Sequence, residues 1–227
     1  ADHVVAAPSD VWHSLVSGFR QGLYWDSIGS TLGSAFFGFL IAFGASVVVA
    51  GVFSSLPKLD RIFFPFVVAF QALPKVAVAP LVLLIIGFGY EAKVVIVAVV
   101  CFFPLLVNCI QGFKIRDKDL YELMKSLGAS RMQMFWRLRA PAALPFIFAG
   151  IHISTLFALL GAIVAEFIGA QSGLGVLLLY NKNAFNIPGF YAVLLIMMII
   201  GIVIDVAMNL IERWAVSWAR DMSNDSK

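Results

Sequence analysis

The sequence predicts an all-α polytopic membrane protein, from its composition and from the length of its apolar segments. Of the 227 residues, 61% are hydrophobic and only 13% are charged, whereas a soluble domain has about 45–50% apolar and about 25% charged residues. Five apolar segments each have the ~20 residues that a helix needs to cross about 30 Å of hydrocarbon. No segment alternates apolar and polar residues as the strands of a membrane barrel do, so the spans are expected to be helices.

The five expected spans form one transmembrane domain, residues 28–211, between an external amino-terminal segment, 1–27, and a cytoplasmic tail, 212–227. This leaves no length for a separate soluble module. The connections are short, except for a polar island at 114–141 and a glycine- and asparagine-rich loop at 171–189. The spans are expected at residues 28–53, 62–88, 94–113, 142–168 and 190–211.

The first and fourth spans each carry a row of small residues spaced four apart. Small residues at this spacing let two helix backbones approach closely in lipid. The rows can pack within one bundle or form a contact between subunits, and the sequence leaves both readings open. The first row comprises Ser30, Ser34, Gly38, Ala42, Ser46 and Ala50, and the second comprises Gly150, Ser154, Ala158 and Ala162 and ends at Glu166.

The second span has Lys75 near its middle, between Pro74 and Pro80. Proline removes a backbone donor and kinks a helix, which leaves free carbonyls that need a polar lining. Lys75 either attracts an oxyanion along a pathway or snorkels to hold the inner half of its helix. Gln71, Lys75 and His152 are the candidate substrate pathway, although a histidine in such a place also serves to hydrogen-bond a neighbouring helix.

The remaining spans carry two cysteines and two acidic residues that need an interpretation. Cys101 and Cys109 lie in the uncharged third span and are expected to be small helix- or lipid-facing residues rather than a disulfide. Glu166, near the external end of the fourth span, is assigned a structural or gating role in preference to substrate contact. Asp205, toward the inner end of the fifth, is expected to pair with a nearby Arg or Lys rather than to relay protons.

The first half of the island predicts a short amphipathic helix. Leu120, Leu123, Met124 and Leu127 fall at i, i+3, i+4 and i+7 and form one apolar stripe. Gly128 stands where a left-handed residue ends a helix. A helix with an apolar stripe, kept away from the membrane by a basic loop, is expected to dock in a protein groove.

A second helix is expected to begin at Ser130. Ser130 and Gln133 match an S-x-x-Q capping box. Pro141 and Pro145 suit the entry to the following span. The island therefore predicts two short helices ahead of the fourth span.

Basic residues set the orientation, because loops rich in Lys and Arg stay in the cytoplasm. Alternation of five spans puts twelve of the 16 Lys and Arg residues on the side of the island, which is then cytoplasmic. Arg20, Lys93 and Lys182 fall on the other side, and Lys75 lies within a span. The twelve are Lys58, Arg61, Lys114, Arg116, Lys118, Lys125, Arg131, Arg137, Arg139, Arg213, Arg220 and Lys227.

Several chemistries have no motif in this sequence. It has no G-x-x-x-x-G-K-[ST] loop for ATP phosphates, no H-E-x-x-H or Cys-x-x-Cys metal motif, and no G-x-S-x-G nucleophile elbow. Its aromatic residues are not interleaved with basic ones, as a nucleic-acid-binding surface would require. The sequence therefore supports neither an enzyme nor a nucleic-acid-binding protein.

The island is similar to the cytoplasmic loop signature of bacterial ABC importer permeases, which runs Glu-Ala-Ala, three residues, Gly, nine residues, Ile-x-Leu-Pro. Glu122, Gly128 and Pro141 match this pattern in identity and spacing. The departures are Leu123 and Met124 for the two alanines, Leu138 for the isoleucine and Ala140 for the leucine. Further segments look like the nitrate/sulfonate/taurine branch of these permeases, within a resemblance that covers residues 8–220. They are residues 73–81, 87–89, 103–104, 165–170 and 172–175.

The resemblance implies a type I ABC importer-like bundle with a cytoplasmic coupling helix, in the inner membrane of a bacterium. It implies cytoplasmic ABC ATPase subunits that carry ATP and Mg, a second permease subunit in a homodimer, and an external or periplasmic solute-binding protein. This chain itself would carry no cofactor or metal. The ATPase-coupling residues would be Glu122, Leu123, Lys125, Leu127, Gly128, Ala129 and Ser130.

The expected function is therefore that of a permease subunit, forming the pathway for a small anionic solute such as nitrate, a sulfonate or taurine. The alternative is an ATP-independent carrier or scaffold subunit, but a carrier should show an internal repeat and ion-coupling charges, which this sequence lacks. The resembled permeases carry one more span upstream. A sixth span is thus expected before residue 1, with a natural five-span chain as the alternative.

Overall fold

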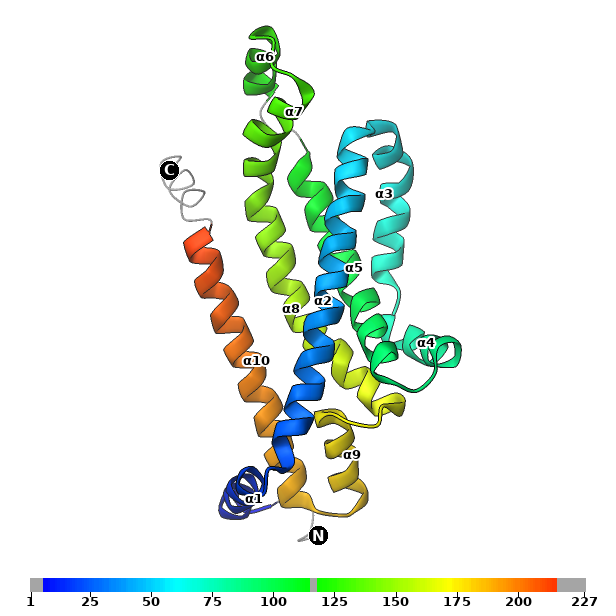
Figure 1. Ribbon diagram of the computed structural model, residues 1–227, viewed down its shortest axis with the longest axis vertical. Coiled ribbons are helices and arrows are strands. Elements are labelled where there is room, and N and C mark those ends of the chain that lie inside the picture. Colours follow the sequence, from blue (N-terminus) through cyan, green and yellow to red (C-terminus); the bar gives the residue numbers. More distant parts are fainter. Residues whose placement is uncertain (1–5, 115–117, 216–227) are drawn as a thin grey trace. The chain divides into compact units, whose positions relative to one another are not determined.

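The computed structural model describes residues 6–114 and 118–215, and every regular element in those ranges is helical (Figure 1). Four of these helices are long and apolar enough to cross a membrane, and a fifth span results if one broken helix pair is counted as a span. The four helices are α2 (Leu23–Ser55), α5 (Tyr90–Phe113), α8 (Ala140–Gly169) and α10 (Ile187–Ala215). The all-α fold class is confirmed.

The amino-terminal segment contributes a helix of its own, α1 (Pro8–Arg20). Gly22, with a φ of 74°, turns the chain between α1 and α2, and only glycine adopts that conformation at little cost. No residue that breaks a helix stands between Leu23 and the expected start of the first span at residue 28. The helix therefore begins at Leu23, earlier than the apolar pattern indicated.

The expected second span, 62–88, is not one continuous helix. It is divided into α3 (Pro57–Ala72), a 3₁₀ turn η1 (Lys75–Val78) and α4 (Ala79–Ile86). Leu73 ends α3 in an extended conformation, with φ −64° and ψ 140°, because the residue before a proline is disfavoured in the α region. Lys75 is consequently the first residue after a break rather than the middle of a helix.

Two further expectations from the sequence need correction. The loop 171–189 contains a helix, α9 (Leu174–Asn183). In the island, α6 (Lys118–Ser126) is separate, as expected, but the second helix is not. It runs from α7 (Arg131–Met134) through a π-helical turn, η2 (Phe135–Arg139), directly into α8. Residues 1–5, 115–117 and 216–227 lie outside the described residues, so the positions expected for Arg116, Arg220 and Lys227 are not addressed.

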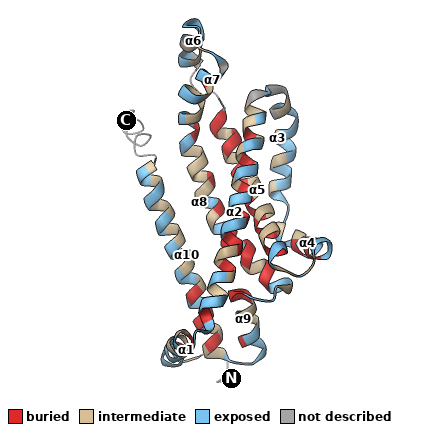
Figure 2. Ribbon diagram, in the orientation of Figure 1, coloured by how far each residue is buried: buried red, intermediate tan, exposed pale blue. Residues whose placement is uncertain are grey.

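The chain divides into two compact units, and the four long helices pass through both. Unit 1 comprises the described residues up to Ile41, Pro74–Cys101 and Thr155–Val206. Unit 2 comprises Ala42–Leu73, Phe102–Ser154 and the remainder of α10 from Ala207. Figure 2 shows buried positions recurring along α5. Half of the most apolar stretch of α5 is buried, against 22% for α2 and α10, so α5 is the most buried of the spans.

Each unit has its own apolar core. In unit 1, Ala92, Ile96 and Val100 of α5 pack with Leu83 of α4 and Ala165 of α8. A second cluster in unit 1 joins Tyr24 of α2 to α9 and α10. In unit 2, Leu106, Cys109, Ile110 and Phe113 of α5 pack with Ala50 of α2 and Ala143 of α8. The side chains of Cys101 and Cys109 are both buried, and no disulfide joins them.

Both rows of small residues pack within the chain. In unit 1, a Cβ added to Gly38 would meet the backbone of Val94 and the side chain of Val97 on α5. In unit 2, Ser46 of the same row donates a hydrogen bond to the carbonyl oxygen of Phe102, at 3.0 Å. Gly150, which begins the second row, lies against Asn108. The rows therefore serve the close approach of α2 and α8 to α5.

Candidate functional site

The island folds into a sharply ended helix. The amide of Gly128 donates to the carbonyl of Lys125 at 3.1 Å, and the amide of Ala129 donates to the carbonyl of Met124 at 3.0 Å. These two bonds are those of a Schellman motif, which requires a left-handed residue at its centre. Gly128 supplies it with a φ of 74°. The prediction that Gly128 ends α6 in the left-handed conformation is confirmed.

The predicted start of the next helix is also present. The amide of Ser130 donates to Oε1 of Gln133 at 2.8 Å, and the amide of Gln133 donates to Oγ of Ser130 at 3.2 Å. This reciprocal pair is the predicted capping box. The turn between α6 and α7 thus has a hydrogen-bonded stop on one side and a hydrogen-bonded start on the other. Its shape follows from local sequence alone.

The α6 segment presents its side chains to the exterior. Among side chains described between residues 119 and 130, none is buried. Leu123 is 54% exposed and Leu127 is 77% exposed, and both belong to the predicted apolar stripe. An apolar stripe on an exposed, capped helix is a surface that another protein can cover. Glu122 and Lys125 are exposed too, but at i+2 and i+5 from Leu120 they lie on the side of the helix opposite the stripe.

Basic side chains of the island stand at the ends of the spans in unit 2. The ammonium of Lys114, after α5, lies 4.2 Å from the ring centroid of Phe64. Arg139 in η2 donates from Nη1 to both the carbonyl and Oγ of Ser54 at the end of α2, each at 3.1 Å. Arg137 is exposed. The basic residues of this segment are therefore divided between anchoring contacts and a free charged surface.

The three candidate pathway residues do not form a single site within either unit. Lys75 begins η1 in unit 1, and its ammonium lies 5.3 Å from the ring centroid of Phe157 on α8. Gln71 and His152 belong to unit 2. Nδ1 of His152 lies 3.6 Å from Oε2 of Glu212 on α10, and both side chains are partly exposed. This contact supports the reading in which His152 joins two helices.

Glu166 and Lys93 are the centre of a buried polar network in unit 1, and this pairing was not predicted from the sequence. The ammonium of Lys93 lies 2.9 Å from Oε1 of Glu166, and the two side chains are 2% and 0% exposed. The same ammonium donates to Oγ of Ser30 at 2.8 Å and to the carbonyl of Ser172 at 2.9 Å. All three donors of the lysine are thereby used. Thr31 donates to Oε1 of Glu166 at 2.8 Å as well.

The Ser-Gly-Leu-Gly segment at 172–175 wraps around the carboxylate of Glu166. The amide of Gly175 donates to Oε2 of Glu166 at 2.8 Å, and the amide of Leu174 donates to Oγ1 of Thr31 at 2.9 Å. The carboxylate therefore caps the amino terminus of α9, where unpaired amides and the helix dipole favour a negative charge. A Cβ on Gly173 would collide with this carboxylate, and its φ of 132° also favours glycine.

This network joins α2, α5, α8 and the start of α9. Of the two roles expected for Glu166, structural or gating, the contacts support the structural one. Lys93 was missed because it was counted only as one of the external basic residues. A signal was available: Lys93 precedes the third expected span, and Glu166 lies at the end of the fourth. Opposite charges at the same end of two spans are candidates for a pair. Asp205 lies partly buried in α10, and the pairing expected for it stays a prediction.

Metal binding has no candidate among the residues that the structure describes, where no group of three or more His, Cys, Asp or Glu residues is arranged to bind an ion. The features described above are ion pairs, helix caps and the exposed apolar stripe of α6. The first two kinds are structural. Of these features, only the stripe on α6 is an exposed apolar surface.

Comparisons with known proteins agree with this arrangement. Residues 25–216 match the family described as binding-protein-dependent transport system inner membrane component. The riboflavin transport system permease protein of Chloroflexus aurantiacus is 32% identical over 207 residues, which are 91% of this chain and 76% of the relative. The formylaminopyrimidine transport permease protein of Halalkalibacterium halodurans is 32% identical over 187 residues, with 80% and 75% covered.

A third relative and a solved structure extend the comparison. The putative aliphatic sulfonates transport permease protein of Bacillus subtilis is 30% identical over 182 residues, which are 80% of this chain and 66% of the relative. A chain from an inward-facing structure of the MetNI methionine ABC transporter superposes with a TM-score of 0.65 and 24% identity. It covers 92% of this chain and 98% of its own length, and this likeness concerns the fold.

Proposed function

This chain belongs to the family of binding-protein-dependent transport system inner membrane components, and we propose that it forms the translocation pathway of an ATP-driven importer in a bacterial inner membrane. The family makes it a multi-pass component of a membrane transporter. The observation that carries the finer proposal is the capped helix α6, with Leu123 and Leu127 exposed and with no buried side chain among those described from 119 to 130.

An exposed apolar stripe on a capped helix suits a docking partner that moves. Gly128 and the capping box fix both sides of the turn by hydrogen bonds. We therefore expect α6 to move as a rigid helix, without local unfolding, when its partner moves. We assign the groove that receives it to cytoplasmic ABC ATPase subunits, which would carry the ATP and Mg. The coupling residues proposed are Glu122, Leu123, Lys125, Leu127, Gly128, Ala129 and Ser130.

The remaining partners follow from the same family. A second permease subunit, in a homodimer, would complete the pathway, and an external solute-binding protein would deliver the solute. For the solute we propose a small anion of the nitrate, sulfonate or taurine kind. Lys75 supports this choice, because it supplies a positive charge at a helix break within an apolar segment. The relative named for aliphatic sulfonates supports it as well.

A heteroaromatic solute is the second candidate, favoured by the relatives named for formylaminopyrimidine and riboflavin transport. The two candidates differ in charge and in ring content, so they separate in one assay. The binding protein that copurifies with the tagged chain is tested with taurine, an alkanesulfonate, nitrate and a formylaminopyrimidine. Binding of the pyrimidine alone would replace the anion proposal.

The coupling proposal is tested with Glu122→Lys and Gly128→Val in proteoliposomes that contain the copurified ATPase. We expect both variants to abolish solute uptake and solute-stimulated ATP hydrolysis while the protein stays in the membrane. A β-branched residue at Gly128 is strained at positive φ. Glu91→Lys, an equal charge reversal at an exposed residue of α5 in unit 1, is the matched control.

Three results would count against the proposal. Parent rates of uptake in both variants would show that the island is not the coupling element. Equal loss in Glu91→Lys would show that charge reversal acts through insertion and not through coupling. Uptake that proceeds without any ATPase would establish the ATP-independent carrier instead.

A further inference from the structure

Helix α1 divides cleanly into a polar and an apolar side. At 100° per residue, the polar residues occupy one arc of about 140° and the apolar ones an arc of about 140° on the other side. A helix of this pattern, with a tryptophan on its apolar side, is typical of a segment that lies in the plane of a membrane surface. The polar residues are Ser9, Asp10, His13, Ser14, Ser17 and Arg20, and the apolar ones are Val11, Trp12, Leu15, Val16 and Phe19.

Part of the apolar side is covered by the chain itself and part is not. Val11 is buried, and a Cβ on Gly18 would collide with the ring of Tyr24. Trp12, on the same side, is 65% exposed. An indole with this exposure on the apolar side of an amphipathic helix indicates an apolar surrounding that does not come from the described residues of this chain.

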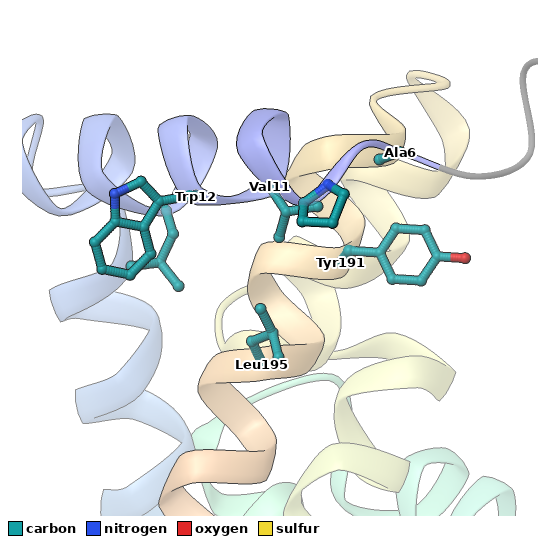
Figure 3. A pocket seen from close by; sticks show the side chains of 7 residues that line it. Ala6, Val11, Trp12, Tyr191 and Leu195 are labelled. Atoms are coloured by element: carbon teal, nitrogen blue, oxygen red, sulfur yellow. The ribbon is translucent and has the colours of Figure 1, made fainter.

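A groove of about 330 Å³ lies between α1 and the first turns of α10, both of which belong to unit 1. Figure 3 shows α1 crossing the start of α10. Trp12 and Val11 lie on the side of α1 toward which α10 runs, and Leu195 lies one turn beyond Tyr191. Among the described residues, no charged side chain lines the groove. Its lining residues are Ala6, Pro8, Val11, Trp12, Leu15, Tyr191 and Leu195.

The depth of this groove follows from α10 being a membrane span that begins at Ile187. At 1.5 Å per residue, Tyr191 and Leu195 lie about 6 Å and about 12 Å along the helix axis from that start. These are the depths of the headgroup region and of the first part of the hydrocarbon. Trp and Tyr are the residues that favour this zone.

The groove leads onto an apolar surface that α10 leaves exposed in the single chain. Met198 and Ile202, one and two turns beyond the groove, are each 54% exposed. The apolar surface therefore runs without interruption from the groove down the span. A slender apolar molecule that fills the groove would continue into the hydrocarbon, and the described lining, which is mostly apolar, suits an acyl chain.

We propose that α1 lies in the membrane interface with Trp12 in lipid, and that the groove between α1 and α10 holds an acyl chain of a membrane phospholipid. This inference depends only on α10 being a membrane span, so it is independent of the proposed transport function. The ligand class is the apolar chain and not a particular headgroup. The helix thereby gains its apolar surrounding from the bilayer.

The first test measures where the two sides of α1 lie. Trp12→Cys and Ser17→Cys, each with Cys101→Ala and Cys109→Ala, receive a nitroxide label in the full chain reconstituted in phosphatidylethanolamine–phosphatidylglycerol bilayers. We expect the nitroxide at position 12 to be highly accessible to oxygen, which dissolves in lipid, and poorly accessible to a water-soluble nickel chelate. The control at position 17, on the polar side, should show the reverse. Nickel access at position 12, or shielding from both reagents by a protein neighbour, would overturn the lipid contact.

The second test measures the occupant of the groove. Leu15→Trp fills it, Leu15→Ala leaves it open, and Leu195→Trp fills it from the other wall if Leu15→Trp misfolds. Native mass spectrometry of protein released from single-lipid nanodiscs reports the phospholipid that stays bound. We expect the filled variants to lose at least severalfold in occupancy relative to the parent and to Leu15→Ala. Equal occupancy in filled and open variants would show that the groove holds no acyl chain.

Discussion

At the scale of single residues, the buried pair of Lys93 and Glu166 is the feature with the largest energetic consequence. Taking both charges out of water is costly, and the cost is offset only because the ammonium uses all three donors and the carboxylate accepts three hydrogen bonds. Such a pair does not need to stabilise the fold more than an apolar pair would. It becomes essential once one partner is removed, since the other charge then remains buried alone.

We therefore expect Lys93→Met to destabilise the protein by about 3–5 kcal/mol. Adding Glu166→Gln to it removes the remaining charge and should restore part of the loss. Thermal unfolding in detergent, followed by the monodisperse fraction in size-exclusion chromatography, measures both. Lys182→Met, at an exposed lysine of α9, is the control and should unfold at the parent temperature. A double variant that is as unstable as the sum of its parts would contradict the pairing.

Lys75 carries the second prediction at this scale. Its screened attraction for one anion is on the order of 1 kcal/mol, so Lys75→Met should slow anion uptake about fivefold and Lys75→Arg should retain most of it. The ring of Phe157 provides the control, because Phe157→Leu removes the aromatic contact and leaves the charge. If Phe157→Leu slows uptake as much as Lys75→Met, the lysine acts by holding η1 in place. Normal uptake by the Met variant would support the snorkelling interpretation.

The sequence was informative for residues whose role is local. Gly128, Ser130 and Gln133 were predicted because a left-handed helix end and a capping box depend on neighbours within a few residues. Lys93 was not, because its role depends on a residue 73 positions away. The glycines at 173 and 175 were noted as a motif, but their reason is the close approach of Glu166, which no local pattern contains.

At the scale of elements, the apolar pattern of the sequence locates the long spans but not the helix break at Leu73 and Pro74. The long spans were found because twenty apolar residues in lipid have few alternatives to a helix. The second expected span is two helices separated by a break, which was not predicted although Pro74 and Pro80 were visible in the sequence. Helix α9 was taken for a loop because its stability comes from the cap that Glu166 provides, not from its length or periodicity.

The apolar stripe of α6 carries the prediction for this scale. Leu123→Asp puts a charge in the middle of the stripe and should reduce copurification of the ATPase at least tenfold, since a buried unpaired carboxylate costs several kcal/mol at an interface. Ser126→Asp adds the same charge at an exposed residue of α6 that is not part of the stripe, and should retain the ATPase. Quantitative pull-down from membranes compares the two. Equal retention by both variants would exclude the stripe as the docking surface.

At the scale of the whole molecule, orientation in the membrane follows from the distribution of charge. Alternation of five spans is expected to put twelve of the 16 basic residues on the side of the island, and loops rich in Lys and Arg stay in the cytoplasm. Of the three expected on the other side, Lys93 is buried and neutralised by Glu166. The external surface is thereby even poorer in free positive charge than the sequence indicated, which strengthens the predicted orientation.

Cysteine labelling tests this orientation directly. Ser126→Cys in α6 and Ala184→Cys after α9 are both exposed positions, each placed in a chain with Cys101→Ala and Cys109→Ala. An impermeant thiol reagent added to intact cells should label position 184 and leave position 126 unmodified, while permeabilised cells should label both. The opposite pattern in intact cells would invert the topology and, with it, the assignment of α6 to the cytoplasm.

The pairing of Lys93 with Glu166 also constrains how the chain is made. Lys93 is synthesised 73 residues before its partner, which at about 5–20 residues per second leaves its ammonium without a counter-ion for about 4–15 s. During that interval the leading end of α5 has to remain hydrated, because a lone ammonium in hydrocarbon is costly. Water is therefore excluded from Lys93 only after the end of α8, which carries Glu166, has been synthesised. A nascent chain arrested between Lys93 and Glu166 would keep Lys93 in contact with water.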